Sequence, residues 1–166
     1  MPITGGYTLN HGDRYAGMVV DAQVNNSVSK LNKSGATVPW GVFVARDGAD
    51  GFKPVDDTTT AADIIGVLRR ELNRAQLDGS TGGAPEDRDA TVLTVGTIYV
   101  PTVGAVTAGD AVYAVVGTDV APSANPGVAN NAAGTGATTG VQIPGAKFIE
   151  TTSGAGLAAV SLVIGG

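Results

Sequence analysis

The residues that could do acid–base chemistry in this 166-residue sequence are two pairs of adjacent carboxylates, Asp56 with Asp57 and Glu86 with Asp87. Two carboxyl groups can act as general acid and general base when their surroundings separate the two pKa values. Both pairs lie in polar stretches, where carboxylates are usually solvated. Because His11 is the only histidine and there is no cysteine, a serine triad and a thiol nucleophile are excluded. The sequence predicts no enzyme and no catalytic residues.

A partial cation-binding pattern occurs at 47–51, because oxygen ligands two or three residues apart beside a glycine can wrap around a hard cation. The third acidic or amide position and the terminal glutamate of a calcium loop are missing, so a turn is the simpler interpretation. The GTGATTG stretch at 134–140 lacks the G-x-G-x-x-G spacing of a dinucleotide site. We therefore predict no metal and no cofactor.

The overall charge bears on the partners that the protein could bind. The formal net charge is −5 and the pI is about 4.6, which argues against nucleic acid or an anionic membrane as a partner of a basic surface. No run approaches the roughly 20 apolar residues of a membrane span, and the first residues do not resemble a signal peptide. We expect a soluble protein that is not exported.

The charges are unevenly distributed along the chain. Residues 1–89 contain 9 Lys and Arg and 12 Asp and Glu, whereas residues 90–166 contain only Lys147, Asp110, Asp119 and Glu150. Small polar side chains could cover the exposed faces of this second half. Alternatively, much of its surface is buried against other chains, because charged residues are depleted at interface cores.

The composition favours strands. The chain has 22 Val and 18 Thr against 8 Leu, and β-branched residues favour pleated, half-buried surfaces. It also has 25 Gly and 8 Pro, which indicates many turns. We predict a mainly β protein, a small antiparallel β-barrel or sandwich with an extended N-terminal arm at 1–15, long loops, and a single β-rich domain at 16–166.

Several stretches have the pattern of individual elements. The strongest β signature is 89–120, and strands are also expected at 16–24 and 38–45, with a polar link between them. A hairpin is expected at 143–164, its last strand buried on both faces. Residues 122–140 form a low-complexity loop of small residues. The segment 63–77 is ambiguous, because its apolar residues share one helical face but Gly66 lies in the middle of the run.

Two features could contact a partner. The arm contains four large apolar side chains, Ile3, Tyr7, Leu9 and Tyr15, which must be buried on the same domain or on a neighbour. Trp40, the only tryptophan, is either a core anchor or an interface residue. Arg69, Arg70 and Arg74 form a local basic cluster, which is either a solvated loop or a contact for an acidic partner surface.

Five segments follow one another in a characteristic order: ADIIGV (62–67), ATVLTVGTIYV (90–100), VTAGDAVY (106–113), IPGAKF (143–148) and GAGLAAV (154–160). Their order resembles that of the tailed-bacteriophage capsid cement or head decoration proteins, and the similarity spans about residues 16–164. Gly-Asp turns and alternating valines are common, so the specificity lies in the order and spacing of the segments. The 122–140 loop departs from simpler family members.

The resemblance implies a structural virion protein with no catalytic residues. It would be made in the host cytoplasm and bind the outer surface of the capsid, where it stabilises contacts between major capsid protein subunits. It would be a homo-oligomer, with a trimer favoured and a dimer possible, and 64–70 would be a strand. The alternative is a phage tail, fibre or carbohydrate-binding β domain, although only eight aromatic residues are available and they are scattered.

Overall fold

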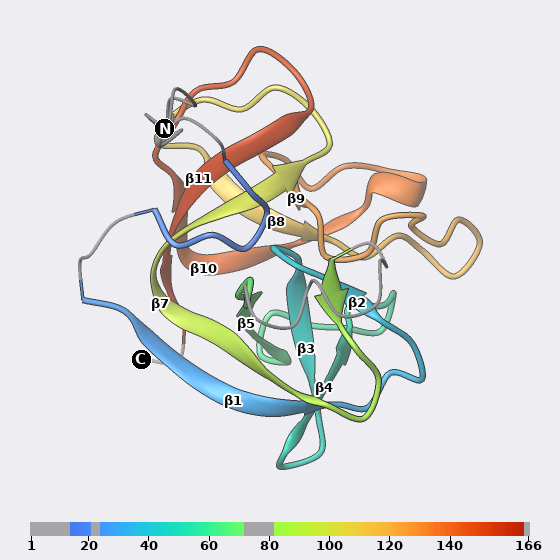
Figure 1. Ribbon diagram of the computed structural model, residues 1–166. Coiled ribbons are helices and arrows are strands. Elements are labelled where there is room, and N and C mark those ends of the chain that lie inside the picture. Colours follow the sequence, from blue (N-terminus) through green and yellow to red (C-terminus); the bar gives the residue numbers. More distant parts are fainter. Residues whose placement is uncertain (1–13, 21–23, 72–81, 165–166) are drawn as a thin grey trace, which may run out of the picture.

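The computed structural model describes residues 14–20, 24–71 and 82–164, and within them the chain is built almost entirely of strands (Figure 1). No α-helix occurs in these ranges; the one helical turn is the 3-10 turn η1 (Gly136–Thr138). The strands are β1 (Asn26–Asn32), β2 (Val38–Pro39), β3 (Phe43–Asp47), β4 (Gly51–Pro54), β5 (Ile64–Leu68), β6 (Gly83–Ala84), β7 (Asp89–Thr102), β8 (Ala111–Val115), β9 (Ala129–Asn130), β10 (Gly140–Phe148) and β11 (Gly156–Val163).

Five of the strands close into a barrel. They follow the order β1-β4-β3-β5-β7, and the ring closes because β1 pairs with β4 on one side and with β7 on the other. The other strands continue from β7 in the order β11-β10-β8-β9, and β9 returns to β7 through one parallel pair, Thr102 with Ala129. The prediction of a mainly β fold built on a small barrel is confirmed.

Strand β7 belongs to both groups of strands. Its residues 89–95 pair with β1, and its residues 95–102 pair with β11. At 14 residues it is by far the longest strand in the described chain, which fits the strong β signature of this stretch. The element that links the two halves of the sheet is thus the one most evident from the sequence.

The core lies on both faces of the central strands. Val92 and Leu93, both fully buried, are neighbours on β7 but belong to different apolar clusters, as do Phe43 and Val44 on β3. Successive side chains of a strand point to opposite faces, so a strand covered on both sides is apolar at every position. This burial explains why these runs show no alternation between apolar and polar residues.

The ambiguous segment at 63–77 begins with a strand, because β5 covers Ile64–Leu68. The helical periodicity was misleading there, and the strand implied by the family resemblance is present; residues 72–77 lie outside the described chain. Gly66 allows the neighbouring strand to approach closely, since a Cβ atom at this position would lie 2.2 Å from the carbonyl oxygen of Leu93 on β7. Such a contact excludes any side chain.

The polar link expected before residue 38 is wrong, because it contains strand β1. In β1, Val28 lies opposite Val92 of β7, and Val28 and Ser29 are both exposed. Polar residues fill this strand because all of its residues except Asn32 are partly or fully exposed. Conversely, 16–24 is not a strand: within its described residues, Val19 forms only an isolated bridge with Ile98.

The second half of the chain also departs from expectation in two places. The low-complexity loop at 122–140 contains strand β9 and the turn η1. Strand β11 is not buried on both faces along its whole length, because Val163 is 57% exposed. Its partner β10 pairs with it at Lys147 and Phe148, so the predicted hairpin is present.

Candidate functional site

The segment that follows the predicted arm is held against β7, and we call residues 14–20 the strap (Figure 1). The amide of Gly17 donates to the carbonyl of Tyr99 at 2.8 Å, the amide of Tyr99 donates to Met18 at 2.9 Å, and the amide of Val20 donates to Thr97 at 2.9 Å. These bonds and the isolated bridge between Val19 and Ile98 attach the strap to β7 without forming a regular strand. The strap therefore fixes the point at which residues 1–13 join the barrel.

Gly17 allows the strap to lie close to the barrel. Its φ is +77°, and its carbonyl accepts a hydrogen bond from the amide of Arg70 at 2.8 Å. A Cβ atom on Gly17 would lie 2.8 Å from the carbonyl oxygen of Leu68 and 2.9 Å from the amide nitrogen of Gly41. Both the backbone conformation and the space therefore require glycine here.

Charged and aromatic side chains fasten the start of the strap. Arg14 forms an ion pair with Glu150, which raises the pKa of the Arg14 guanidinium, and the same guanidinium lies 5.4 Å from the ring centroid of Tyr99. In a second contact the strap supplies the ring instead of the cation, because the guanidinium of Arg70 lies 4.5 Å from the ring centroid of Tyr15. Cation–π contacts of this kind stabilise exposed sites by about 0.5–1 kcal/mol.

The predicted contact residues differ in where they lie and in how exposed they are. Ile3, Tyr7 and Leu9 lie outside the described residues. Tyr15 is 44% exposed on the strap, whereas Trp40 is only 3% exposed and packs within the core cluster that also contains Leu68.

The ion pair of Arg14 with Glu150 could not be predicted from the sequence, because the two residues are 136 positions apart. Arg70 was visible only as one member of a basic cluster. The structure separates it from Arg69 by giving it the ring of Tyr15 as a neighbour.

A groove of about 640 Å³ lies beside the strap, and we call it the Trp40 groove. Its walls are mainly apolar and rich in proline, and they come from the strap, β2, β7 and the loop before β9. The lining residues are Ala16, Ser34, Ala36, Thr37, Val38, Pro39, Trp40, Val42, Pro54, Arg70, Gly82, Pro101, Ala124, Asn125, Pro126 and Val128. Arg70 therefore connects the groove with the strap.

A second, larger groove of about 990 Å³ crosses the barrel wall between β1 and β11. Val28 and Val163 are exposed in it, and its two charged lining residues, Lys30 and Arg46, are both cationic. Exposed valines that line one groove, from two strands that each pair with β7, are the kind of surface that a partner covers. Of the exposed large apolar side chains in the described chain, Val120, Ile149 and Val163 belong to the poorly charged second half.

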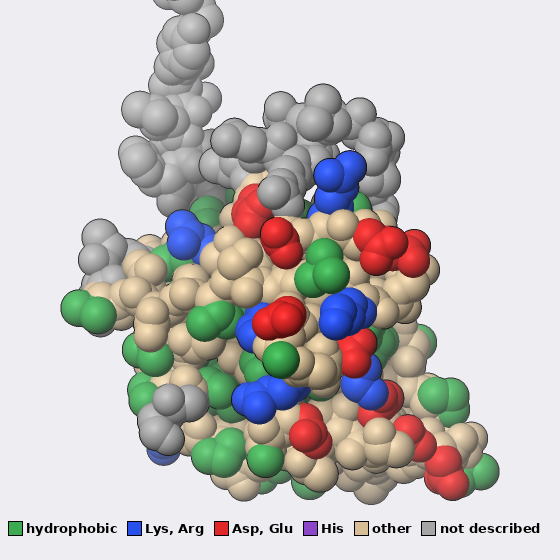
Figure 2. Space-filling model, turned by 90° about the horizontal axis from the view of Figure 1, so that it is seen from below, with side chains coloured by type: hydrophobic (Ala, Val, Ile, Leu, Met, Phe, Trp, Pro, Cys, Tyr) green, Lys and Arg blue, Asp and Glu red, His purple; other side chains and the backbone are tan. Residues whose placement is uncertain are grey.

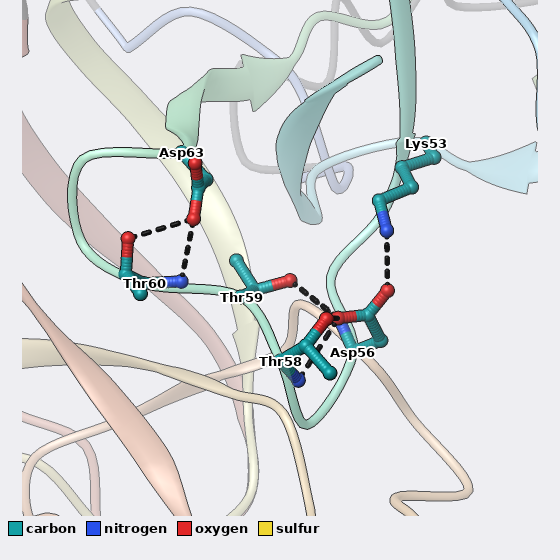
Figure 3. Close-up of polar contacts among 6 residues, drawn as sticks. All are labelled: Lys53, Asp56, Thr58, Thr59, Thr60 and Asp63. Carbon is teal, nitrogen blue, oxygen red and sulfur yellow. Dashed lines mark hydrogen bonds and ion pairs between the residues drawn. The ribbon is translucent and has the colours of Figure 1, made fainter.

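Asp56 of the first carboxylate pair has a structural role (Figure 3). One oxygen of Asp56 lies 2.5 Å from the ammonium nitrogen of Lys53, and the other accepts hydrogen bonds from the hydroxyls of Thr58 and Thr59. These contacts, the one to Lys53 first, hold the pKa of Asp56 well below its usual range. A carboxylate that stays ionised and has hydrogen-bond partners on both oxygens stabilises the turn.

A second carboxylate, that of Asp63, is also held by threonine. It accepts hydrogen bonds from the hydroxyl and the amide of Thr60 at 2.7 and 2.9 Å (Figure 3). These hydrogen bonds lower the pKa of Asp63. The second pair, Glu86 and Asp87, is exposed in the turn before β7. The stretch 47–51 is the turn between β3 and β4, and the described residues contain no group of three or more potential metal ligands.

The charges on the face seen from below are mixed rather than of one sign (Figure 2). Lysine and arginine side chains lie among aspartate and glutamate side chains, and apolar side chains are scattered between them. A basic field that could attract a nucleic-acid backbone is not present on this face. Among the described residues, no helix is long and apolar enough to cross a membrane.

A closed β-barrel with an attached strap and two surface grooves is the architecture of a β domain that can bind other proteins. The family model that matches the chain is that of the structural cement protein of phages, described by E217 gp24 and Pam3 gp6, and the match covers residues 3–163. The chain therefore belongs to this family and is a structural capsid cement protein of a bacteriophage. The alternative of a tail, fibre or carbohydrate-binding domain is not favoured.

The fold agrees with a solved structure. A chain in the capsid of Myoviridae phage XM1 has 24% sequence identity and a TM-score of 0.69, and the similarity covers 98% of both chains. At this level of identity the comparison concerns the fold. No curated protein matches the sequence.

Proposed function

We propose that the protein binds the outer surface of the phage head and ties major capsid protein subunits together, with residues 1–13 as the element that reaches the shell. The observation that carries the proposal is the strap, which fixes the root of this segment to the longest strand of the barrel through three backbone hydrogen bonds. A contact segment transmits force only if its root is held. The large apolar side chains of Ile3, Tyr7 and Leu9 supply the contact area.

We also propose that the protein is made in the host cytoplasm and acts as a homo-oligomer, with a trimer favoured over a dimer. The near absence of charge in residues 90–166 and the exposed valine at position 163 support burial of this half between copies. Capsids are symmetric, and closed symmetric oligomers match symmetric sites on them.

Binding to purified phage heads assembled without the cement protein tests the role of the arm. A chain lacking residues 2–13 keeps Arg14 and its ion pair, so it is expected to fold and to lose most of its occupancy on heads. Replacement of Ile3, Tyr7 and Leu9 by serine is expected to have the same effect. The matched control replaces the polar arm residues Thr4, Thr8 and Asn10 by alanine, and it is expected to bind normally. Unchanged occupancy of the truncated chain would refute the proposal.

A further inference from the structure

Within the part of the chain that the structure describes, two buried hydrogen-bond donors of the Trp40 groove have no partner. They are the indole nitrogen Nε1 of Trp40 and the guanidinium nitrogen Nε of Arg70. Buried donors are almost always satisfied, and an unsatisfied one destabilises the state that contains it. Both side chains line the same groove. Two orphan donors in one groove indicate that the missing partner is an acceptor that arrives with a ligand.

The charge of the groove specifies the acceptor. Among the described residues that line the groove, Arg70 is the only charged one, so none of them offers a carboxylate to the guanidinium. The adjacent carboxylate of Glu71 is engaged elsewhere, because it accepts hydrogen bonds from the amide and the hydroxyl of Thr91 at 3.1 and 2.7 Å. A guanidinium in apolar surroundings binds a carboxylate more strongly than a neutral acceptor.

A glycine packs against the indole edge of Trp40. A Cβ atom on Gly82 would lie 3.3 Å from Nε1 of Trp40 and 3.2 Å from the neighbouring ring carbon. The φ angle of Gly82 is not in the left-handed region, so the backbone does not require glycine here. Its lack of a side chain instead lets the chain pass close to the N–H group, where a methyl group would crowd the indole edge.

We propose that the Trp40 groove binds an acidic side chain on an extended segment of the major capsid protein. The carboxylate pairs with Arg70, and a second acceptor of the segment, a backbone carbonyl, takes the hydrogen bond of Trp40. Apolar walls with Pro39, Pro101 and Pro126 suit an extended apolar chain around the acidic residue. The inference rests on the proposed function, because it names the capsid contact of that same binding event.

The location of the groove selects the capsid protein as the occupant. Ala16 of the strap lines the groove, and Arg70 both lines it and stacks on Tyr15. The groove therefore opens beside the root of the segment that we assign to the shell. The loop residues 124–126 form another part of its wall, which gives the low-complexity stretch a role in contact.

Binding of variants to heads assembled without the cement protein tests the contact. Arg70→Gln is expected to weaken binding about tenfold, because one charge-assisted hydrogen-bonded pair is lost. Trp40→Phe, which removes the indole N–H, and Gly82→Ala, which covers it, are each expected to weaken binding severalfold. The matched control is Arg69→Gln, which removes the same charge next to the groove and is expected to stay within twofold of the unmodified chain.

The outcomes separate this inference from the proposed function. If the unmodified chain binds and Arg70→Gln binds equally well, the groove contact is wrong and the cement role stands. Equal losses in Arg69→Gln and Arg70→Gln would mean general electrostatic attraction and would also overturn the inference. Failure of the unmodified chain to bind heads would refute the proposed function, and the inference would fall with it. Thermal unfolding of each variant shows whether it is folded.

Photo-crosslinking identifies the occupant. The exposed groove residue Ala124 is replaced by p-benzoylphenylalanine, and decorated heads are irradiated. The expected product is a cross-link to a capsid-protein peptide that contains Asp or Glu. A synthetic copy of this peptide should then shift the single indole N–H resonance of the protein, and its Asp→Asn or Glu→Gln form should shift it less. A cross-link to a second copy of this chain, or equal shifts with both peptides, would overturn the proposal.

Discussion

The guanidinium of Arg70 lies 4.5 Å from the ring centroid of Tyr15, and this contact joins the strap to the end of β5. It lies next to a backbone hydrogen bond, because the amide of Arg70 also donates to Gly17. The side chain and the backbone of one residue thus hold two points of the strap.

Loss of this aromatic ring should loosen the strap without unfolding the barrel. Tyr15→Ala removes the cation–π contact and is expected to cost about 0.5–1 kcal/mol of local stability. Amide hydrogen exchange at Gly17 and Val20 should become faster by severalfold, because both amides bond to β7. Tyr15→Phe keeps a ring over Arg70 and should exchange nearly as the unmodified chain does. Equal protection in the alanine variant would show that the contact does not hold the strap.

The close approach of the strap makes Gly17 sensitive to substitution. Gly17→Ala places a methyl group 2.8 Å from backbone atoms and strains a residue with positive φ, so a loss of about 2 kcal/mol is expected. Urea unfolding measures the loss. Gly154→Ala is the control, since nothing lies within 4 Å of its Cβ position and its φ is not in the left-handed region. Similar losses in both variants would contradict the role of Gly17.

The ion pair of Asp56 with Lys53 should make stability depend on pH in the acid range. The pKa of Asp56 is lowered in the folded protein, so its contribution is fully present above the unfolded value of about 4 and is lost as the pH falls toward the folded value. Because the side chains of this pair are 39% and 40% exposed, solvent screening limits the contribution to about 1 kcal/mol.

Asp56→Asn separates this charge from the turn geometry, because an amide oxygen can still accept from Thr58. The variant should be less stable at pH 7 and should approach the unmodified chain below pH 4. Unfolding by urea at a series of pH values checks the convergence. Asp57→Asn is the neighbouring control, and it should not show the loss of stability at pH 7 that Asp56→Asn shows. A constant difference at all pH values would rule out the ion pair as the cause.

The exposed valine of β11 provides a test of assembly. Val163→Lys adds a charge to an apolar groove that already holds Lys30 and Arg46, and it is expected to shift the proposed trimer toward the 16.4 kDa monomer. Sedimentation velocity measures the shift. Val120→Lys places the same charge on an exposed loop residue that lines neither groove, and it should leave the mass unchanged. A trimer that survives Val163→Lys would place the contact between copies elsewhere.

The strands that are buried on both faces could be predicted from the sequence, because their runs of β-branched residues are continuous. Strand β1 could not, because a strand that is largely exposed can contain Ser27, Ser29 and Lys30 and still pair through its backbone with β7. The start of the 63–77 segment was ambiguous for a physical reason. Tertiary contact with Leu93, invisible in local periodicity, requires Gly66 and an extended chain.

The proposed contact sites depend more than the strands do on residues that are far apart in the sequence. Arg70 could be noticed as a charge, but its isolation in an apolar groove depends on Trp40, Pro101 and Pro126, which come from three separate parts of the chain. The same holds for Arg14 and Glu150. Such sites are set by the tertiary fold, which brings together residues that carry no local pattern.

Because β7 is shared by both groups of strands, a force on residues 1–13 would enter the folded domain through this one strand. A pull on residues 1–13 reaches β7 through the strap, whose hydrogen bonds to Tyr99 and Thr97 lie along one strand and resist shear together. From β7 the force passes to β1 and β5 on one side and to β11 on the other. Expansion of the shell would thus be opposed at once by the barrel strands and by the strands outside the ring, so the weakest single loop would not set the strength of the cement.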